Sequence, residues 1–260
     1  MLPLIDRFTR LVERILPERG SPLTRYLDPS ALATPMVAVE AVRRTIARVL
    51  GAVCASIEAA LAAANRGEPV HPGKDAISVP EAAEALRQAQ VFLSDVTGPP
   101  DSDDEQQRLT STLHALDHAS RMAEAASGKI DFGTVRCGPD DARAGQLCAD
   151  AMRSAASVAG EVEALPGITQ SPRATPASRS INATSGAATV STEEALAQLK
   201  RCASELAELQ PSHRSATLGA VANGSLSADA AIVRVDTVRS LEALAHHAWR
   251  SVAHLVGAEK

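Results

Sequence analysis

The sequence has very few aromatic residues: Phe, Trp and Tyr together make up 2% of its 260 residues. A β-sandwich or β-barrel needs alternating runs of Val, Ile, Tyr and Phe, and no such run occurs. The hydrophobic fraction is 45%, and much of it is alanine, the best helix former. The composition therefore predicts an all-α fold in which Ala-lined helices pack closely.

An excess of basic residues is also missing, since the formal net charge is −5. Nucleic-acid-binding domains normally have a concentrated basic face, so we expect no nucleic acid among the partners. The cysteines are widely spaced and form no Cys-x-x-Cys pair, which argues against a zinc ribbon and for reduced thiols in the cytoplasm. These cysteines are Cys54, Cys137, Cys148 and Cys202.

The sequence also lacks long apolar runs and the pattern of a secretory signal peptide. No run approaches the ~20 apolar residues that span a bilayer. The first residues carry charges throughout, where a signal peptide would have an apolar core. We therefore expect neither a membrane-spanning helix nor a signal peptide in these residues.

Helical periodicity fills most of the chain, because apolar residues recur at steps of three and four. Thr34 with Pro35 marks the first helix start, and Ser191 with Glu194 forms a capping box. The carboxylates of residues 101–105 suit the positive end of a helix dipole better than a metal site. The sequence predicts an up-and-down helical bundle with helices over residues 35–65, 80–96, 101–127, 139–165, 191–209 and 227–255, and a separate short helical piece within 211–226.

Composition divides the chain into consecutive parts. Residues 1–20 are predicted as an amphipathic juxtamembrane-type helix, because 4–16 place their apolar side chains on one face. This helix either packs on the body of the protein or contacts a membrane surface, since Arg outnumbers acidic residues there. Residues 23–128 form a first three-helix unit and 139–256 a second helical unit. The second is interrupted by a flexible linker over 166–190, rich in Ser, Thr, Ala, Gly and Pro.

Two helical segments read like copies of each other. Asp117-His118-Ala119 occupies the same place in its segment as His246-His247-Ala248 does in the last helix, and an Arg follows four residues after the first member of each. A short echo of this kind indicates a duplicated helical unit.

Three local patterns occur in a defined order along the chain. They are Leu27-Asp28-Pro29 followed by Thr34-Pro35, Asp117-His118-Ala119 with Met122-Ala123-Glu124, and residues 241–250 with His254-Leu255. With these patterns, roughly Leu23 to Leu255 resembles the PhoU-like cytoplasmic region at the C-terminal end of bacterial sodium/phosphate cotransporter-family proteins.

The resemblance implies two PhoU-like three-helix units and a role in phosphate transport or its regulation. The segment 4–16 would be the exit from a membrane domain that these residues do not include. Without that domain the chain has no route for an ion across a bilayer, so it would regulate transport rather than perform it. The expected location is cytoplasmic, at the inner face of the cell membrane. The expected partners are a membrane transporter domain or another membrane protein, the membrane surface through 4–16, and further copies of the chain.

The resemblance also raises a metal site, because PhoU-like proteins often carry an acidic residue four positions before the Asp of the Asp-His-Ala helix. Two such carboxylates project from one helix face and can bridge hard cations or iron. This chain departs from the pattern, since Leu113 takes the upstream position in the first copy and His246 replaces the Asp in the second. The candidate ligands of a divalent or iron-type metal are Asp117, Glu242 and His246, with His118 or His247 assisting. The alternative is that these histidines hydrogen-bond within the bundle or face water.

Enzymes form the main rival class. A carboxylate-bridged di-iron bundle uses Glu-x-x-His on two helices, whereas Glu242 and His246 are four residues apart and occur once. No phosphate-binding P-loop and no Gly-x-Ser-x-Gly nucleophile motif is present. We therefore expect a non-catalytic regulatory or interaction module. A generic helical adaptor or scaffold is the first alternative, and a metal-binding helical-bundle enzyme is the second.

Overall fold

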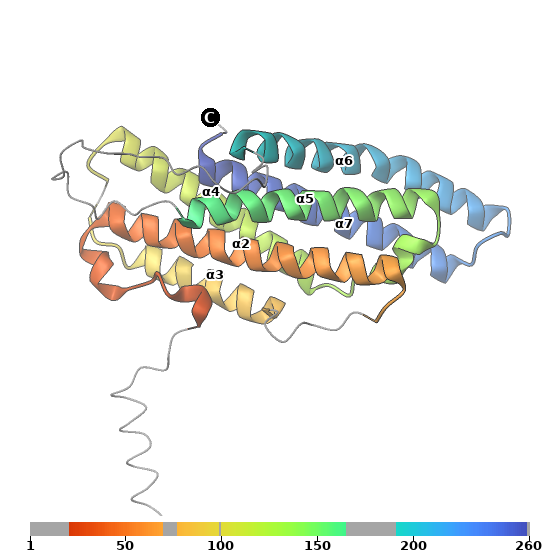
Figure 1. Cartoon of the computed structure of the whole chain (residues 1–260), viewed down its shortest axis with the longest axis horizontal. Helices are drawn as coiled ribbons and strands as arrows, with labels where there is room; N and C mark the ends of the chain where they lie inside the picture. The colour runs from red at the N-terminus through yellow and green to blue at the C-terminus, as the bar shows by residue number, and fades with distance from the viewer. Residues whose placement is uncertain (1–20, 70–76, 99, 165–190, 259–260) are drawn as a thin grey trace, which may run out of the picture.

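The computed structural model describes residues 21–69, 77–98, 100–164 and 191–258. Within these ranges the chain is α-helical and contains no strand, which confirms the all-α bundle (Figure 1). The helices are α2 Pro35–Arg66, α3 Val79–Ser94, α4 Asp103–Ser127, α5 Pro139–Ala164, α6 Thr192–Ala222 and α7 Ala228–Val256. Three short 3-10 helices accompany them: η1 Pro22–Thr24, η2 Pro29–Ala33 and η3 Phe132–Arg136. The predicted segments 1–20 and 166–190 lie outside the described residues.

Several helices begin or end at residues whose side chains or backbone satisfy the free groups of a helix end. Ser191 and Glu194 form the predicted capping box, and Ser227 caps α7. Gly67 ends α2 in the left-handed conformation with φ of 73°, as glycine does after many helices. Thr34 precedes α2 as predicted, but its side chain makes no capping hydrogen bond.

Consecutive helices alternate in direction along the long axis of the molecule (Figure 1). α5 lies in the middle and packs on α2, α6 and α7, while α4 packs chiefly on α7 and α3 covers α2 and α4. Ion pairs set the antiparallel register of α2 and α5: Arg48 lies 2.7 Å from Glu163 and Arg153 lies 2.8 Å from Glu58. The buried side chains of all six helices form one continuous core.

The connection between α4 and α5, where the sequence predicts no helix, contains η3, which packs on α2 and α5. Gly145 on α5 permits this approach, because a Cβ atom there would lie 2.9 Å from Cγ1 of Val135. η3 is too short to show hydrophobic periodicity in the sequence. It could therefore not be predicted, and only the structure reveals it.

The predicted break at Pro211 is wrong. Residues 192–222 form one helix with Pro211 inside it, although proline removes a backbone donor and usually ends a helix. Leu209 and His213 are buried on either side of the proline. The hydroxyl of Ser212 donates to the carbonyl of Leu209 at 2.8 Å. Tertiary packing on both sides therefore outweighs the local propensity.

α2 contains no uninterrupted run of ~20 apolar residues, as expected, but it is apolar over most of its length. By length and composition α2 could cross a membrane, and half of its most apolar stretch is buried inside the bundle. Core helices of soluble proteins meet the same criterion. We read the apolar character of α2 as a consequence of its packing on α5, α3 and α4.

Candidate functional site

Five of the seven histidines of the chain gather where α4 packs on α7. This histidine cluster consists of His114 and His118 on α4 and His246, His247 and His254 on α7. The helical spacing of four residues places His114 and His118 on one face of α4. The same face of α7 carries His247 and His254, seven residues apart. The bundle therefore concentrates imidazole groups at one contact between two helices.

The centre of the cluster is the pair His118 and His247, whose Nδ1 atoms lie 3.2 Å apart. At this distance one Nδ1–H donates to the lone pair of the other ring. Around the pair, the ring of His118 lies 5.8 Å from that of His254 in a stacked arrangement and 6.3 Å from that of His246 in an edge arrangement. His114 stacks on His254 at 5.0 Å.

This arrangement brings the two copies of the sequence echo face to face. His118 and His247 are equivalent positions in the echo, and they contact each other. Ala119 and Ala248 are also equivalent, and both are buried. The equivalent residues therefore meet at the point where the antiparallel helices α4 and α7 pack together. The buried hydroxyl of Ser251 donates to the carbonyl of Ala115 at 2.7 Å and holds the same register.

The surroundings of the pair disfavour its protonation. Burial, followed by the charges of His247 and Arg250, lowers the pKa of His118 to about 4. Burial, followed by His246 and Arg121, lowers the pKa of His247 as well. Asp117 opposes both shifts without reversing them. At neutral pH the two rings are therefore uncharged and can share one proton between their Nδ1 atoms.

These pKa shifts predict a stability that falls in mild acid. A histidine whose folded pKa lies below its unfolded value of ~6.5 binds its proton first in the unfolded chain. Stability is therefore retained above pH ~6.5 and is lost as the pH falls towards 4, the folded value for His118. We expect a smaller loss of melting temperature between pH 7 and pH 4.5 in the double variant His118→Gln/His247→Gln than in the wild type. Equal losses, measured by circular dichroism melts in matched buffers, would show that other groups dominate this range.

The three residues predicted as metal ligands are not drawn together. Asp117 is exposed, and one of its carboxylate oxygens accepts from Nε of Arg121 at 2.9 Å. His246 belongs to the histidine cluster and also contacts Trp249, with 6.0 Å between the ring centroids. Glu242 is half-buried on α7, one turn before His246. In the described part of the chain, no three His, Cys, Asp or Glu side chains are placed to hold a metal ion.

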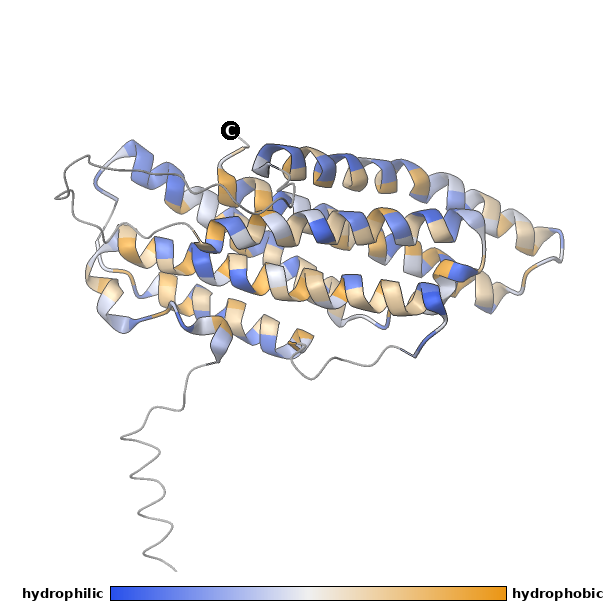
Figure 2. Ribbon diagram, viewed as in Figure 1, coloured by the Kyte–Doolittle hydropathy of each residue, from blue (hydrophilic) through white to orange (hydrophobic). Residues whose placement is uncertain are grey.

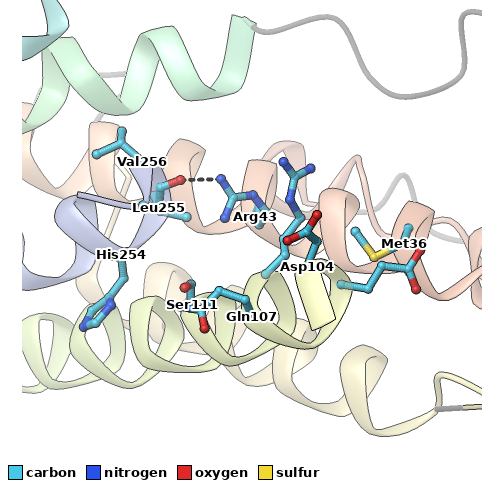
Figure 3. A pocket seen from close by; sticks show the side chains of 11 residues that line it. Met36, Arg43, Asp104, Gln107, Ser111, His254, Leu255 and Val256 are labelled. Carbon is cyan, nitrogen blue, oxygen red and sulfur yellow. Dashed lines mark hydrogen bonds between the residues drawn. The ribbon is translucent and has the colours of Figure 1, made fainter. Parts of the chain in front are cut away.

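A pocket of about 420 Å³ opens where α2, the first half of α4 and the end of α7 meet (Figure 3). Arg43 reaches across it and donates to the carbonyl of Leu255, which satisfies the C-terminal end of α7. Glu40 lies 3.4 Å from Arg43 and 3.9 Å from Arg108, so both cations face a carboxylate. The balanced charges favour a role in holding α7 on α2 over the binding of a free anion. His254 lines this pocket and joins it to the histidine cluster.

Sequence reasoning missed a buried polar triad at the other end of the bundle. Asp141 and His213 each have only 2% of their side-chain surface exposed, and Oδ1 of Asp141 lies 2.9 Å from Nε2 of His213. Arg234 on α7 places Nε 3.2 Å from the same oxygen and donates through Nη2 to the other carboxylate oxygen. The triad ties the first turn of α5 to α6 and α7. The only signal of the triad in the sequence was Asp141, an acidic residue in the first turn of α5. An acidic residue there is equally explained by the helix dipole.

All four cysteines are free; Cys54, Cys148 and Cys202 are buried and Cys137 is exposed. Burial raises the pKa of the Cys54 thiol to about 12 and also raises that of Cys148. A thiol with a raised pKa is a poor nucleophile. The buried cysteines therefore serve as small apolar core residues.

No protein-family model, curated protein or solved structure matches this chain. What is established is the class that the fold defines, an all-α up-and-down bundle with a histidine cluster between α4 and α7. The PhoU-like resemblance rests on the sequence patterns alone.

Proposed function

We propose that this chain is a non-catalytic, PhoU-like regulatory module of sodium-dependent phosphate transport, placed in the cytoplasm at the inner face of the cell membrane. Its partner would be a membrane transporter domain or another membrane protein. Support comes from the ordered sequence patterns, from the up-and-down bundle that they imply, and from the contact between the two echoed segments.

One observation favours an interaction role above others: an apolar tip on the α6–α7 hairpin. This apolar tip consists of Leu218, Ile232 and Val233, whose side chains are 50%, 59% and 41% exposed. Leu218 stands four residues before the end of α6 and Ile232 four residues after the start of α7, so both lie at the same level. The hairpin extends past the neighbouring ends of α2 and α5 (Figure 1), and hydrophobic colouring runs along its helices up to the polar turn (Figure 2).

Contiguous exposed apolar surface marks a contact with another molecule, and we propose this role for the apolar tip. A generic adaptor, the first alternative, would use the same tip without any link to phosphate. The two functions differ in one property: only the regulatory module changes phosphate uptake when the tip is altered.

The proposed membrane contact is tested by the variant Phe8→Asp/Leu11→Asp. These residues lie outside the described part of the chain, and the sequence places both on the apolar face of 4–16. Burying each side chain is worth ~1.5–3 kcal/mol. The variant should therefore bind the membrane at least about tenfold more weakly, which corresponds to a loss of about 1.4 kcal/mol or more in binding free energy. The measurement is the partition of the full chain between membrane and soluble fractions of lysed cells.

A matched control is Thr9→Asp, which adds a charge to the same segment, beside the apolar face that the sequence predicts. A second pair, Ile232→Asp/Val233→Asp and Ser215→Asp, tests the apolar tip against a polar, exposed position on α6. Phosphate uptake by the host cells is recorded for each variant. A wild-type chain found entirely in the soluble fraction, with uptake unchanged in every variant, would refute the proposal and leave the generic adaptor.

A further inference from the structure

We propose that His118 and His247 form a binding site for one divalent transition-metal ion of the zinc class, shared between α4 and α7. The site differs from the three residues suggested by the sequence, because it uses the histidine pair and neither carboxylate. It is also independent of the proposed regulatory function, so either can fail without the other.

The distance between the two nitrogens fits a common metal. Zinc binds histidine nitrogen at ~2.0–2.1 Å in tetrahedral geometry, which separates two ligand atoms by about 3.3 Å. The Nδ1 atoms of His118 and His247 lie 3.2 Å apart. The observed separation is therefore within about 0.1 Å of the one that a tetrahedral metal ion requires of two ligand atoms.

The pair is accessible and in the form that binds metal. Both rings are half-buried, so an ion can reach them from solvent. A metal ligand must be the neutral imidazole, which is the main form of histidine above its ordinary pKa of ~6.5. The proton now shared between the Nδ1 atoms moves to a ring Nε2 when a metal takes its place, so no proton is released on balance.

Among the described residues, no third protein ligand is placed to bind the same metal ion. Water would therefore fill the remaining positions around the metal. The nearby charges are mixed: Arg121 and Arg250 oppose a cation, while Asp117 and Glu124 favour it. Imidazole suits zinc, copper and nickel, whereas magnesium and calcium prefer oxygen ligands. We therefore expect reversible binding of zinc and no binding of magnesium at the same concentration.

The experiment is calorimetric titration of zinc into the full chain at pH 7.5. Every protein carries Cys137→Ser, because the exposed thiol of Cys137 is a competing ligand. The variants are His118→Gln and His247→Gln, and the matched control is His114→Gln, which removes an exposed imidazole from the same helix one turn away. Circular dichroism confirms that each variant is helical. Magnesium is titrated as the comparison ion.

We expect one zinc ion per chain, with an affinity that falls at least about tenfold in His118→Gln and in His247→Gln, since even the loss of a supporting group costs 10–100-fold. The affinity of His114→Gln should equal that of the parent. Zinc should also raise the melting temperature of the parent and not of the two pair variants, because the ion joins α4 to α7. Equal affinities in all variants would place the metal elsewhere and overturn the proposal, as would the absence of any zinc binding by the parent. The second result would mean that the pair makes a hydrogen bond only.

Discussion

Replacing Asp141 with Ala is expected to lower the free energy of unfolding by about 3–5 kcal/mol, the usual cost of removing one partner from a buried ion pair. The carboxylate is 2% exposed and accepts from both His213 and Arg234. Its loss leaves a guanidinium with no counter-charge in the triad and a buried imidazole nitrogen without its acceptor. Urea unfolding followed by circular dichroism measures the change.

Asp140→Ala is the matched control for this variant. Asp140 is the preceding residue in the same first turn of α5, and its side chain is exposed. Both substitutions remove a favourable interaction with the helix dipole, worth about 0.3–1 kcal/mol, so the difference between them isolates the triad. A difference below about 1 kcal/mol would mean that water replaces the lost contacts. If the cost does come from the stranded charge, Arg234→Met in the Asp141→Ala background should restore part of the stability.

The helices could be predicted because their signals are local. The signals are a stripe of Val, Leu and Ala, a Ser at the start of a helix with a Glu three residues later, and a Gly at its end. Each of them lies within one or two helical turns of sequence. The segments found in this way match α2, α3, α4, α5 and α7 to within two residues. The element that failed, the helix broken at Pro211, is one where the local signal and the tertiary packing disagree.

The sites could be predicted only in part, because they depend on contacts distant in sequence. The echo related residues 117–119 to 246–248 by their sequence, yet it gave no reason for the equivalent histidines His118 and His247 to touch. His213 and Arg234 lie 72 and 93 residues from Asp141, and none of the three belongs to a recognisable motif. The sequence therefore pointed to Asp117 as a ligand, whereas in the structure that carboxylate pairs with Arg121.

Pro211→Ala is expected to raise the free energy of unfolding by about 2 kcal/mol. Proline inside a helix costs ~3 kcal/mol relative to alanine, and its stiffening of the unfolded chain returns ~0.4–1 kcal/mol of that. The side chain of Pro211 is exposed, so its removal costs little packing. The new N–H can donate to the carbonyl of Ala207, one turn earlier. Urea unfolding at pH 7 measures the gain.

Pro139→Ala is the control, because Pro139 is the first residue of α5, where a missing N–H has no partner to lose. Its effect should stay within about 0.5 kcal/mol. A loss of stability in Pro211→Ala would instead point to the triad, because His213 follows two residues later and hydrogen-bonds to Asp141. It would show that the helix direction imposed by the proline is what brings His213 to the triad. In that case the loss should disappear when Pro211→Ala is made in the Asp141→Ala background, where the imidazole has no carboxylate left to reach.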